Sequence, residues 1–118
     1  MYRLQEVHSP TSRKAFFSFP FKLYKGCSEW VPPITKEEKA VFNTESNPVF
    51  ENAEAKLFLA MKGNEVVGRI AAMINWIEVK EQGKTKVRFG WYDSIDDIEV
   101  SKLLLEAVYD WGKEKGLT

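Results

Sequence analysis

Three apolar stretches separated by short turns most strongly restrict the folds open to this chain. The stretches are residues 55–61, 66–79 and 86–92. Gly63 and Asn64 tolerate positive φ, so residues 62–65 predict a tight hairpin turn, and residues 81–84 predict a second turn. Gly68, inside the second stretch, predicts a bulge or a point of close approach. Two successive hairpins therefore predict a three-stranded antiparallel meander.

A long amphipathic stretch follows the third strand and predicts a helix that packs on the sheet. Its apolar residues recur at steps of three and four, which is the period of one helix face. They are Val100, Leu103, Leu104, Ala107, Val108 and Trp111. Asp96 is expected to cap this helix, with Glu99 three residues later, and Gly116 to end it. Strand alternation predicts Phe89 and Trp91 on the same face of the third strand.

The N-terminal half predicts shorter elements. Residues 2–7 alternate as in a half-buried strand, and Thr11 or Ser12 is expected to cap a short helix at 13–19. Pro20 is expected to interrupt that helix because proline lacks an N–H. A capping box predicts a second short helix at 35–42. The many aromatic residues of segment 16–50 predict either a lid over a sheet or groove, or a satellite core under loops.

Composition excludes several classes of function. The 118 residues suit one domain, and 17 basic residues balance 17 acidic ones, so nothing favours a nucleic-acid partner. No apolar run approaches the length of a membrane span, which predicts no membrane partner. His8 and Cys27 are the single histidine and cysteine, so no metal site is expected. A lone cysteine also favours a reducing, cytoplasmic setting, with Cys27 as a buried or half-buried thiol.

Three stretches carry a resemblance to a known family. They are residues 58–72, residues 88–92 with the helix that follows, and residues 19–26 with 30–33. Together they resemble the N-terminal half of the GNAT superfamily of acyl-CoA N-acyltransferases, and the third is similar to a group of longer bacterial GNAT-like proteins. The predicted fold class is α/β (α+β): an N-terminal strand, two short helices, a three-strand meander and one long C-terminal helix. The resemblance implies one GNAT-like domain, residues 1–118, truncated after that helix.

The resemblance implies transfer of an acetyl group from acetyl-CoA to an unknown small-molecule amine or peptide. In that family CoA phosphates bind at the N-terminus of the long helix, where the helix dipole favours anions. By position, the implied residues for acetyl-CoA or CoA are Trp91, Tyr92, Ser94, Asp96 and Asp97. Tyr92 also serves as a candidate general base.

Asp93 is the second candidate general base, by its position at the end of the third strand. The alternative for Tyr92 and Asp93 is structural: a buried ring edge and a turn carboxylate. The glycines of the family's phosphate loop are missing here, and Asp96 and Asp97 would repel a pyrophosphate by about 1 kcal/mol per charge pair. The alternative for these acids is a helix cap.

The sequence is also compatible with a non-catalytic role. The chain then acts as an inactive GNAT-like module that binds a ligand or protein, or that dimerises. A meander with one long helix leaves an open sheet edge, which predicts a homodimer unless something covers it. Ile74, Trp76 and Ile77 are the residues expected to form an apolar dimer patch.

Overall fold

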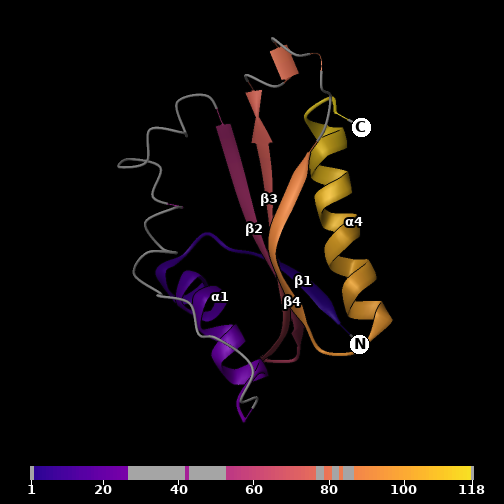
Figure 1. Cartoon of the computed structure of the whole chain (residues 1–118). Coiled ribbons are helices and arrows are strands. Elements are labelled where there is room, and N and C mark those ends of the chain that lie inside the picture. Colours follow the sequence, from indigo (N-terminus) through magenta and orange to yellow (C-terminus); the bar gives the residue numbers. More distant parts are fainter. Residues whose placement is uncertain are drawn as a thin grey trace.

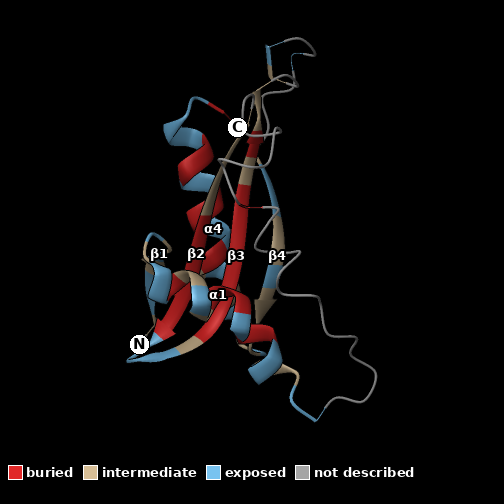
Figure 2. Cartoon of the chain, turned by 90° about the vertical axis from the view of Figure 1, so that its left-hand side faces the viewer, coloured by how far each residue is buried: buried red, intermediate tan, exposed pale blue. Residues whose placement is uncertain are grey.

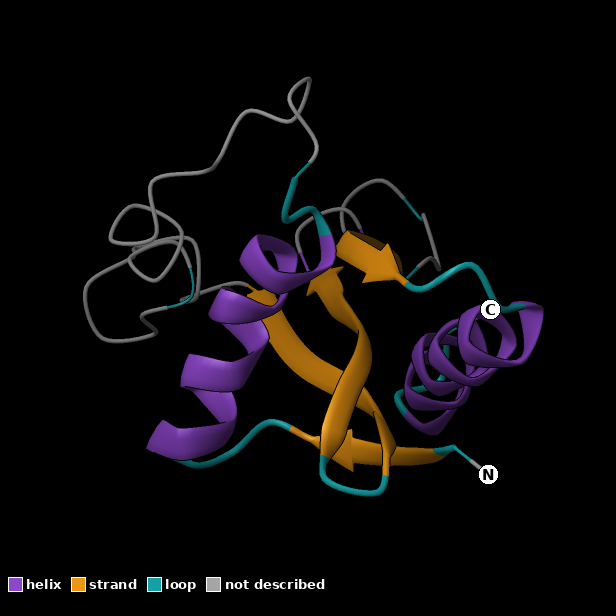
Figure 3. Cartoon of the chain, turned by 90° about the horizontal axis from the view of Figure 1, so that it is seen from below, coloured by secondary structure: helices purple, strands orange, loops and turns teal. Residues whose placement is uncertain are grey.

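Among the residues that the structure describes, four antiparallel strands form one sheet, and one helix lies on each face of it (Figures 1 and 3). The computed structural model describes residues 2–26, 42, 53–76, 79–80, 83 and 87–117. The elements are β1 (Arg3–Glu6), α1 (Pro10–Leu23), β2 (Ala53–Lys62), β3 (Glu65–Asn75), β4 (Arg88–Ser94) and α4 (Ile98–Glu114). The sheet order β1-β2-β3-β4 follows the chain, so the predicted α+β class with an N-terminal strand and a meander is confirmed.

The β2–β3 hairpin forms the centre of the sheet. Its turn is the predicted one, with Gly63 at φ 61° between Lys62 and Glu65. The register shifts by one residue beside Ala60 and Met61, so β3 contains a bulge next to Gly68. A Cβ on Gly68 would lie 2.8 Å from side-chain atoms of both Val100 and Leu104. The bulge and the close approach predicted at Gly68 are both present.

Helix α4 covers one face of the sheet with the predicted stripe. Val100 and Leu104 are fully buried, and the core on this side also contains Ile70 and Ile74 of β3. Figure 2 shows β3 buried along most of its length. The helix cap is Asp97 and not Asp96, because the Asp97 side chain accepts a hydrogen bond from the Glu99 N–H. The predicted capping box from Asp96 to Glu99 is therefore wrong, because the N-cap lies one residue later in the chain.

Helix α1 covers the opposite face and is longer than predicted. Ser9, and not Thr11 or Ser12, is its N-cap, and the backbone N–H groups and side chains of Ser9 and Ser12 form a reciprocal capping box. The helix continues through Pro20 to Leu23, so the predicted interruption is wrong. Phe16 and Phe17 are buried here against β2 and Phe42, so these three aromatic residues form core rather than a lid, whereas Phe21 is 39% exposed.

Some predictions lie outside the described residues. These include the helix at 35–42 apart from Phe42, the segment 30–33, Cys27 and Ile77. Ile74 is fully buried, so it cannot contribute to an exposed dimer patch, and Trp76 Nε1 donates to Glu54 Oε2 at 2.8 Å. In the part of the chain that the structure describes, no helix is long and apolar enough to cross a membrane. The same part contains no group of three or more potential metal-ligating side chains.

The close packing at Gly68 leads to a stability prediction. Gly68→Ala forces a methyl group onto Val100 and Leu104, so we expect the free energy of unfolding to fall by about 1–3 kcal/mol. Gly90→Ala in β4 is the matched control, because its Cβ would meet only the flexible end of Met73, at 3.2 Å. Urea unfolding measures both. Equal losses in the two variants would contradict tight packing at Gly68.

Candidate functional site

Strand β4, where the sequence placed its candidate residues, contains a bulge. Arg69 pairs with Asp93 and Ala71 with Gly90, so Ile70 alone lies opposite both Trp91 and Tyr92. Trp91 has φ 49° and is the one non-glycine residue of the described chain with positive φ. The extra residue places Trp91 on the α1 side, where its ring meets Phe42 edge to face at 4.7 Å between centroids. The prediction that Trp91 shares a face with Phe89 is therefore wrong, because a bulge shifts the alternation of a strand.

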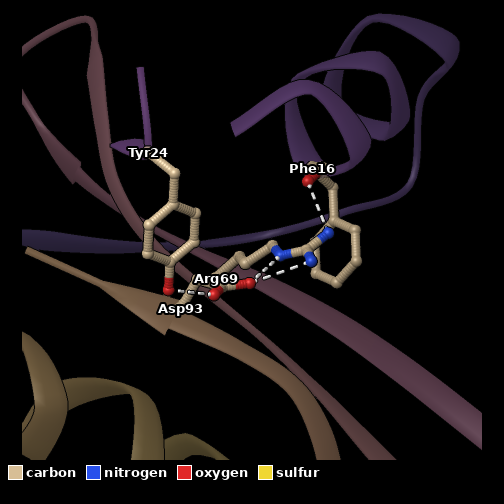
Figure 4. Close-up of polar contacts among 4 residues, drawn as sticks. All are labelled: Phe16, Tyr24, Arg69 and Asp93. Carbon is tan, nitrogen blue, oxygen red and sulfur yellow. Dashed lines mark hydrogen bonds and ion pairs between the residues drawn. The ribbon is translucent and has the colours of Figure 1, made fainter. Parts of the chain in front are cut away.

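A buried polar cluster lies between β3, β4 and α1 (Figure 4). The Arg69 side chain is 5% exposed and that of Asp93 is 16% exposed. Arg69 Nε and Nη2 each lie 2.9 Å from Asp93 Oδ2, and the Tyr24 hydroxyl donates to Asp93 Oδ1 at 2.7 Å. Both carboxylate oxygens are therefore engaged. A buried ion pair survives desolvation only with such additional hydrogen bonds.

The same guanidinium explains why α1 continues through Pro20. In an α-helix the carbonyl of Phe16 would accept from the N–H of residue 20, and proline has none. Arg69 Nη1 donates to this carbonyl at 3.1 Å, and the Arg69 guanidinium carbon lies 5.0 Å from the Phe16 ring centroid. A residue of the sheet thus supplies the hydrogen bond that the helix lacks.

Three hydroxyl groups meet on the opposite face of β4, beside α4. The Tyr92 hydroxyl donates to Ser101 Oγ at 2.5 Å, and Ser94 Oγ lies 3.5 Å from the same atom. Ser94 Oγ also donates to the Ile95 carbonyl at 3.1 Å. These bonds fasten β4 to the first turns of α4. Tyr92 stays 37% exposed, so its ring faces solvent beside the helix.

The start of α4 is occupied by its own cap. Asp97 Oδ1 accepts from the Glu99 N–H at 2.9 Å, and Asp97 Oδ2 accepts from the Tyr2 hydroxyl at 2.6 Å. The hydrogen bond from Tyr2, then that from the Glu99 N–H, lowers the pKa of Asp97 below its ordinary value. The same Tyr2–Asp97 bond raises the pKa of Tyr2. Of the two acids predicted to bind phosphate or cap the helix, Asp97 is the cap and Asp96 is exposed.

The structure separates the predicted site residues. Tyr92 and Ser94 face α4, whereas Trp91 and Asp93 face α1, so the sheet lies between the two pairs. Their catalytic and cofactor-binding roles remain predictions. Sequence reasoning missed Arg69, although it is the one charged residue in the apolar run 66–74 and that isolation was a usable signal. Tyr24 and Ser101 had no comparable signal.

A hollow of about 750 Å³ lies between α1 and the β2–β3 hairpin. We call it the α1 groove. It is lined by Ala15, Ser18, Phe19, Lys22, Lys62, Asn64, Glu65 and Val66. Three of these residues are apolar and five are polar or charged, and Lys22 Nζ lies 3.4 Å from Glu65 Oε1. Both of those side chains are mostly exposed, so this ion pair contributes little to stability.

Two curated proteins are similar to nearly the whole chain. The protein named "Bacterial ceramide synthase" from Caulobacter vibrioides (strain NA1000 / CB15N) is 33% identical over 113 residues, which cover 95% of this chain and 29% of that protein. "Protein YghO" from Escherichia coli (strain K12) is 34% identical over 103 residues, which cover 87% of this chain and 26% of that protein. The chain thus spans less than a third of each relative. No family model matches, and no solved structure matches.

These comparisons overturn the GNAT resemblance. The relatives are named bacterial ceramide synthase and YghO and not GNAT acyltransferases, and no family model supports a GNAT domain. The implied N-acetyl transfer from acetyl-CoA and the inactive GNAT-like alternative are overturned with it. A hairpin followed by a third strand and a long helix is a local order of elements that does not identify a chemistry.

The link between Pro20 and Arg69 predicts a coupled pair of substitutions. Arg69→Met removes the cationic partner of Asp93 and the donor to the Phe16 carbonyl, and we expect it to cost about 3–5 kcal/mol. In a Pro20→Ala background the Ala N–H can bond the Phe16 carbonyl, so the same substitution should cost less, with a coupling of at least about 0.5 kcal/mol. Urea unfolding of the four proteins measures this cycle.

Arg13→Met is the matched control for that cycle, because Arg13 also lies against a phenylalanine ring, that of Phe17, at 5.8 Å. It makes no contact that depends on Pro20, so its cost should be the same in both backgrounds. Additive costs for Arg69→Met and Pro20→Ala would show that the Phe16 carbonyl does not link them.

The cap of α4 predicts an acid-sensitive contribution to stability. Since the folded state lowers the pKa of Asp97, its carboxylate stabilises the fold above the unfolded pKa of about 3.9 and ceases to do so as pH falls through the folded value. Asp97→Asn keeps a good N-cap without the charge, so its stability should fall less on acidification. Urea unfolding at a series of pH values tests this, with Asp96→Asn as the control. Identical pH profiles for Asp97→Asn and the unmodified chain would contradict the assignment.

Proposed function

We propose that this chain is a lipid-binding part of an enzyme that makes a ceramide-type lipid. The observation that carries the proposal is the 33% identity to the Caulobacter protein named bacterial ceramide synthase, across 95% of this chain. Because that match covers 29% of the named protein, we propose a contribution to the enzyme and not the whole activity.

The α1 groove has the chemistry that such a lipid requires. A ceramide has long hydrocarbon tails and an uncharged head with hydroxyl and amide groups. Ala15 and Val66 offer apolar surface above the buried Phe19, and Ser18 and Asn64 offer a hydroxyl and an amide. The charged side chains among the lining residues are those of Lys22, Lys62 and Glu65. Small-molecule sites usually combine an apolar lining with a few polar groups that fix orientation. We therefore place the lipid along the groove, with its head towards Ser18 and Asn64.

The buried polar cluster supports this placement because it fixes one wall of the groove. Arg69 holds the carbonyl of Phe16, one residue from Ala15 and two from Ser18, which both line the groove. Tyr24 holds the end of the same helix to Asp93. Binding residues need support from neighbours that lock them in place. In this proposal Arg69 and Asp93 act as positioning residues and do not touch the lipid.

CoA binding remains a separate prediction. A phosphate at the start of α4 would have to displace the Asp97 carboxylate from the Glu99 N–H, next to the exposed Asp96. Like charges at that distance oppose the exchange. Calorimetric titration of CoA into the chain tests this prediction independently of the lipid groove.

A fluorescent short-chain ceramide is the probe for the groove. We expect saturable binding to the chain, measured by fluorescence anisotropy, and competition by unlabelled ceramide. Ser18→Trp fills the groove and should weaken binding at least tenfold, whereas Lys14→Trp, at another exposed position on α1 that does not line the groove, should leave it unchanged. Equal binding by the two variants would remove the groove from the proposal, and no saturable binding to the unmodified chain would remove the proposal itself.

A further inference from the structure

The exposed apolar residues of this chain gather in one place. Seven large hydrophobic side chains of the described residues are exposed, and five of them lie on β4 or on the outer side of α4. They are Phe89 at 53%, Tyr92 at 37%, Ile98 at 83%, Leu105 at 40% and Tyr109 at 59% exposed. We call this set the α4–β4 surface. A clustered apolar patch of this kind marks an interaction site more often than scattered single residues do.

The helical part of this surface is a continuous stripe. Ile98, Leu105 and Tyr109 stand seven and four residues apart, so they lie on one side of α4, away from the buried stripe. A shallow hollow of about 440 Å³ runs along them, with Ser101, Lys102 and Glu106 as the other lining residues. At 1.5 Å per residue the stripe is about 16 Å long.

The strand part of the surface lies at an edge of the sheet. Among the described strands β4 pairs with β3 alone, at the end of the order β1-β2-β3-β4 (Figure 2). The Phe89 and Tyr92 rings meet edge to face at 6.3 Å between centroids, and Tyr92 is bonded to Ser101 of α4. Strand and helix therefore present one joined surface. An edge of this kind usually needs a cover or a partner.

The charges of this stripe are complementary to those of a second copy of the same stripe. Lys102 and Glu106 are the two charged residues that line the hollow, one of each sign, four residues apart near the middle of the stripe. If a second α4 lies antiparallel across the first, with the two-fold axis between them, Lys102 of each copy faces Glu106 of the other. The same axis brings Ile98 beside Tyr109. A two-fold contact makes each such pair twice.

We propose that the α4–β4 surface is the contact between two copies of this chain. A second copy supplies the apolar cover and both charge partners at once. An anionic lipid surface fits less well, because helices that lie on membranes carry a basic polar face and this stripe balances one lysine with one glutamate. Because the apolar part of the surface consists of three residues of one helix and two of one strand, we expect a weak, concentration-dependent dimer. This inference does not rest on the proposed lipid function.

Sedimentation equilibrium of the chain across the micromolar range tests the dimer. We expect a monomer–dimer equilibrium, abolished by Leu105→Glu and unchanged by Leu4→Glu. Leu4 is the matched control because it is 39% exposed, on β1, against 40% for Leu105. Circular dichroism checks that both variants fold. A strict monomer, a dimer that tolerates Leu105→Glu, or open-ended association overturns the proposal. So does a monomer that co-sediments with phosphatidylcholine vesicles, which would assign the surface to lipid.

A charge exchange tests the antiparallel arrangement. Lys102→Glu and Glu106→Lys each place like charges opposite one another, so each should weaken dimerisation about tenfold at low salt. The double variant Lys102→Glu/Glu106→Lys restores opposite charges across the axis and should recover the dissociation constant of the unmodified chain. The double variant also restores opposite charges at residues 102 and 106 within each helix. Circular dichroism must therefore show equal helix content in the single and double variants, so that a change in dimerisation does not reflect a change in the helix itself. Additive losses in the double variant would overturn the proposed two-fold contact.

Discussion

The buried guanidinium of Arg69, on β3, contacts both β4 and α1. It pairs with Asp93 across β3 and β4 and bonds the Phe16 carbonyl of α1, while Asp93 also accepts from Tyr24. Its charge is nearly excluded from water, so each partner is needed to offset the cost of burial. If helix α1 moved away from the sheet, the buried Arg69 guanidinium would lose its hydrogen bond to the Phe16 carbonyl. Together with the buried rings of Phe16 and Phe17, this side chain fixes the position of α1 and with it the groove beside the β2–β3 hairpin.

The bulge in β4 makes that interaction geometrically available. Strand alternation reverses at Trp91, so Asp93 faces α1 while Tyr92 and Ser94 face α4. Without the extra residue, every side chain that follows it in β4 would point to the face of the sheet opposite to the one it faces now. The positive φ of Trp91 is an unfavourable conformation of order 1–3 kcal/mol, and the contact with Phe42 and the neighbouring ion pair hold it in place.

What the sequence predicted correctly were features set by neighbours along the chain. The Gly63 turn, the meander and the buried stripe of α4 follow from local turn chemistry and period. The errors at Pro20 and Trp91 share a different cause, because each depends on contacts far away in sequence: Arg69 lies 53 residues from Phe16. For the same reason the sequence did not separate the candidate residues of β4 between the two faces of the sheet. The family resemblance failed since order of elements alone does not carry function.

The sheet divides the molecule into two faces with different chemistry. On the α1 face, a buried ion pair supports a groove with a polar rim. On the α4 side, hydroxyl bonds fasten the helix to β4, and an apolar stripe with one charge of each sign points outward. A second copy docked on that stripe lies across the sheet from the groove, so pairing leaves a groove open on the outside of each copy. Lipid binding and dimer formation are thus compatible by geometry, and a substitution in one surface leaves the residues of the other untouched.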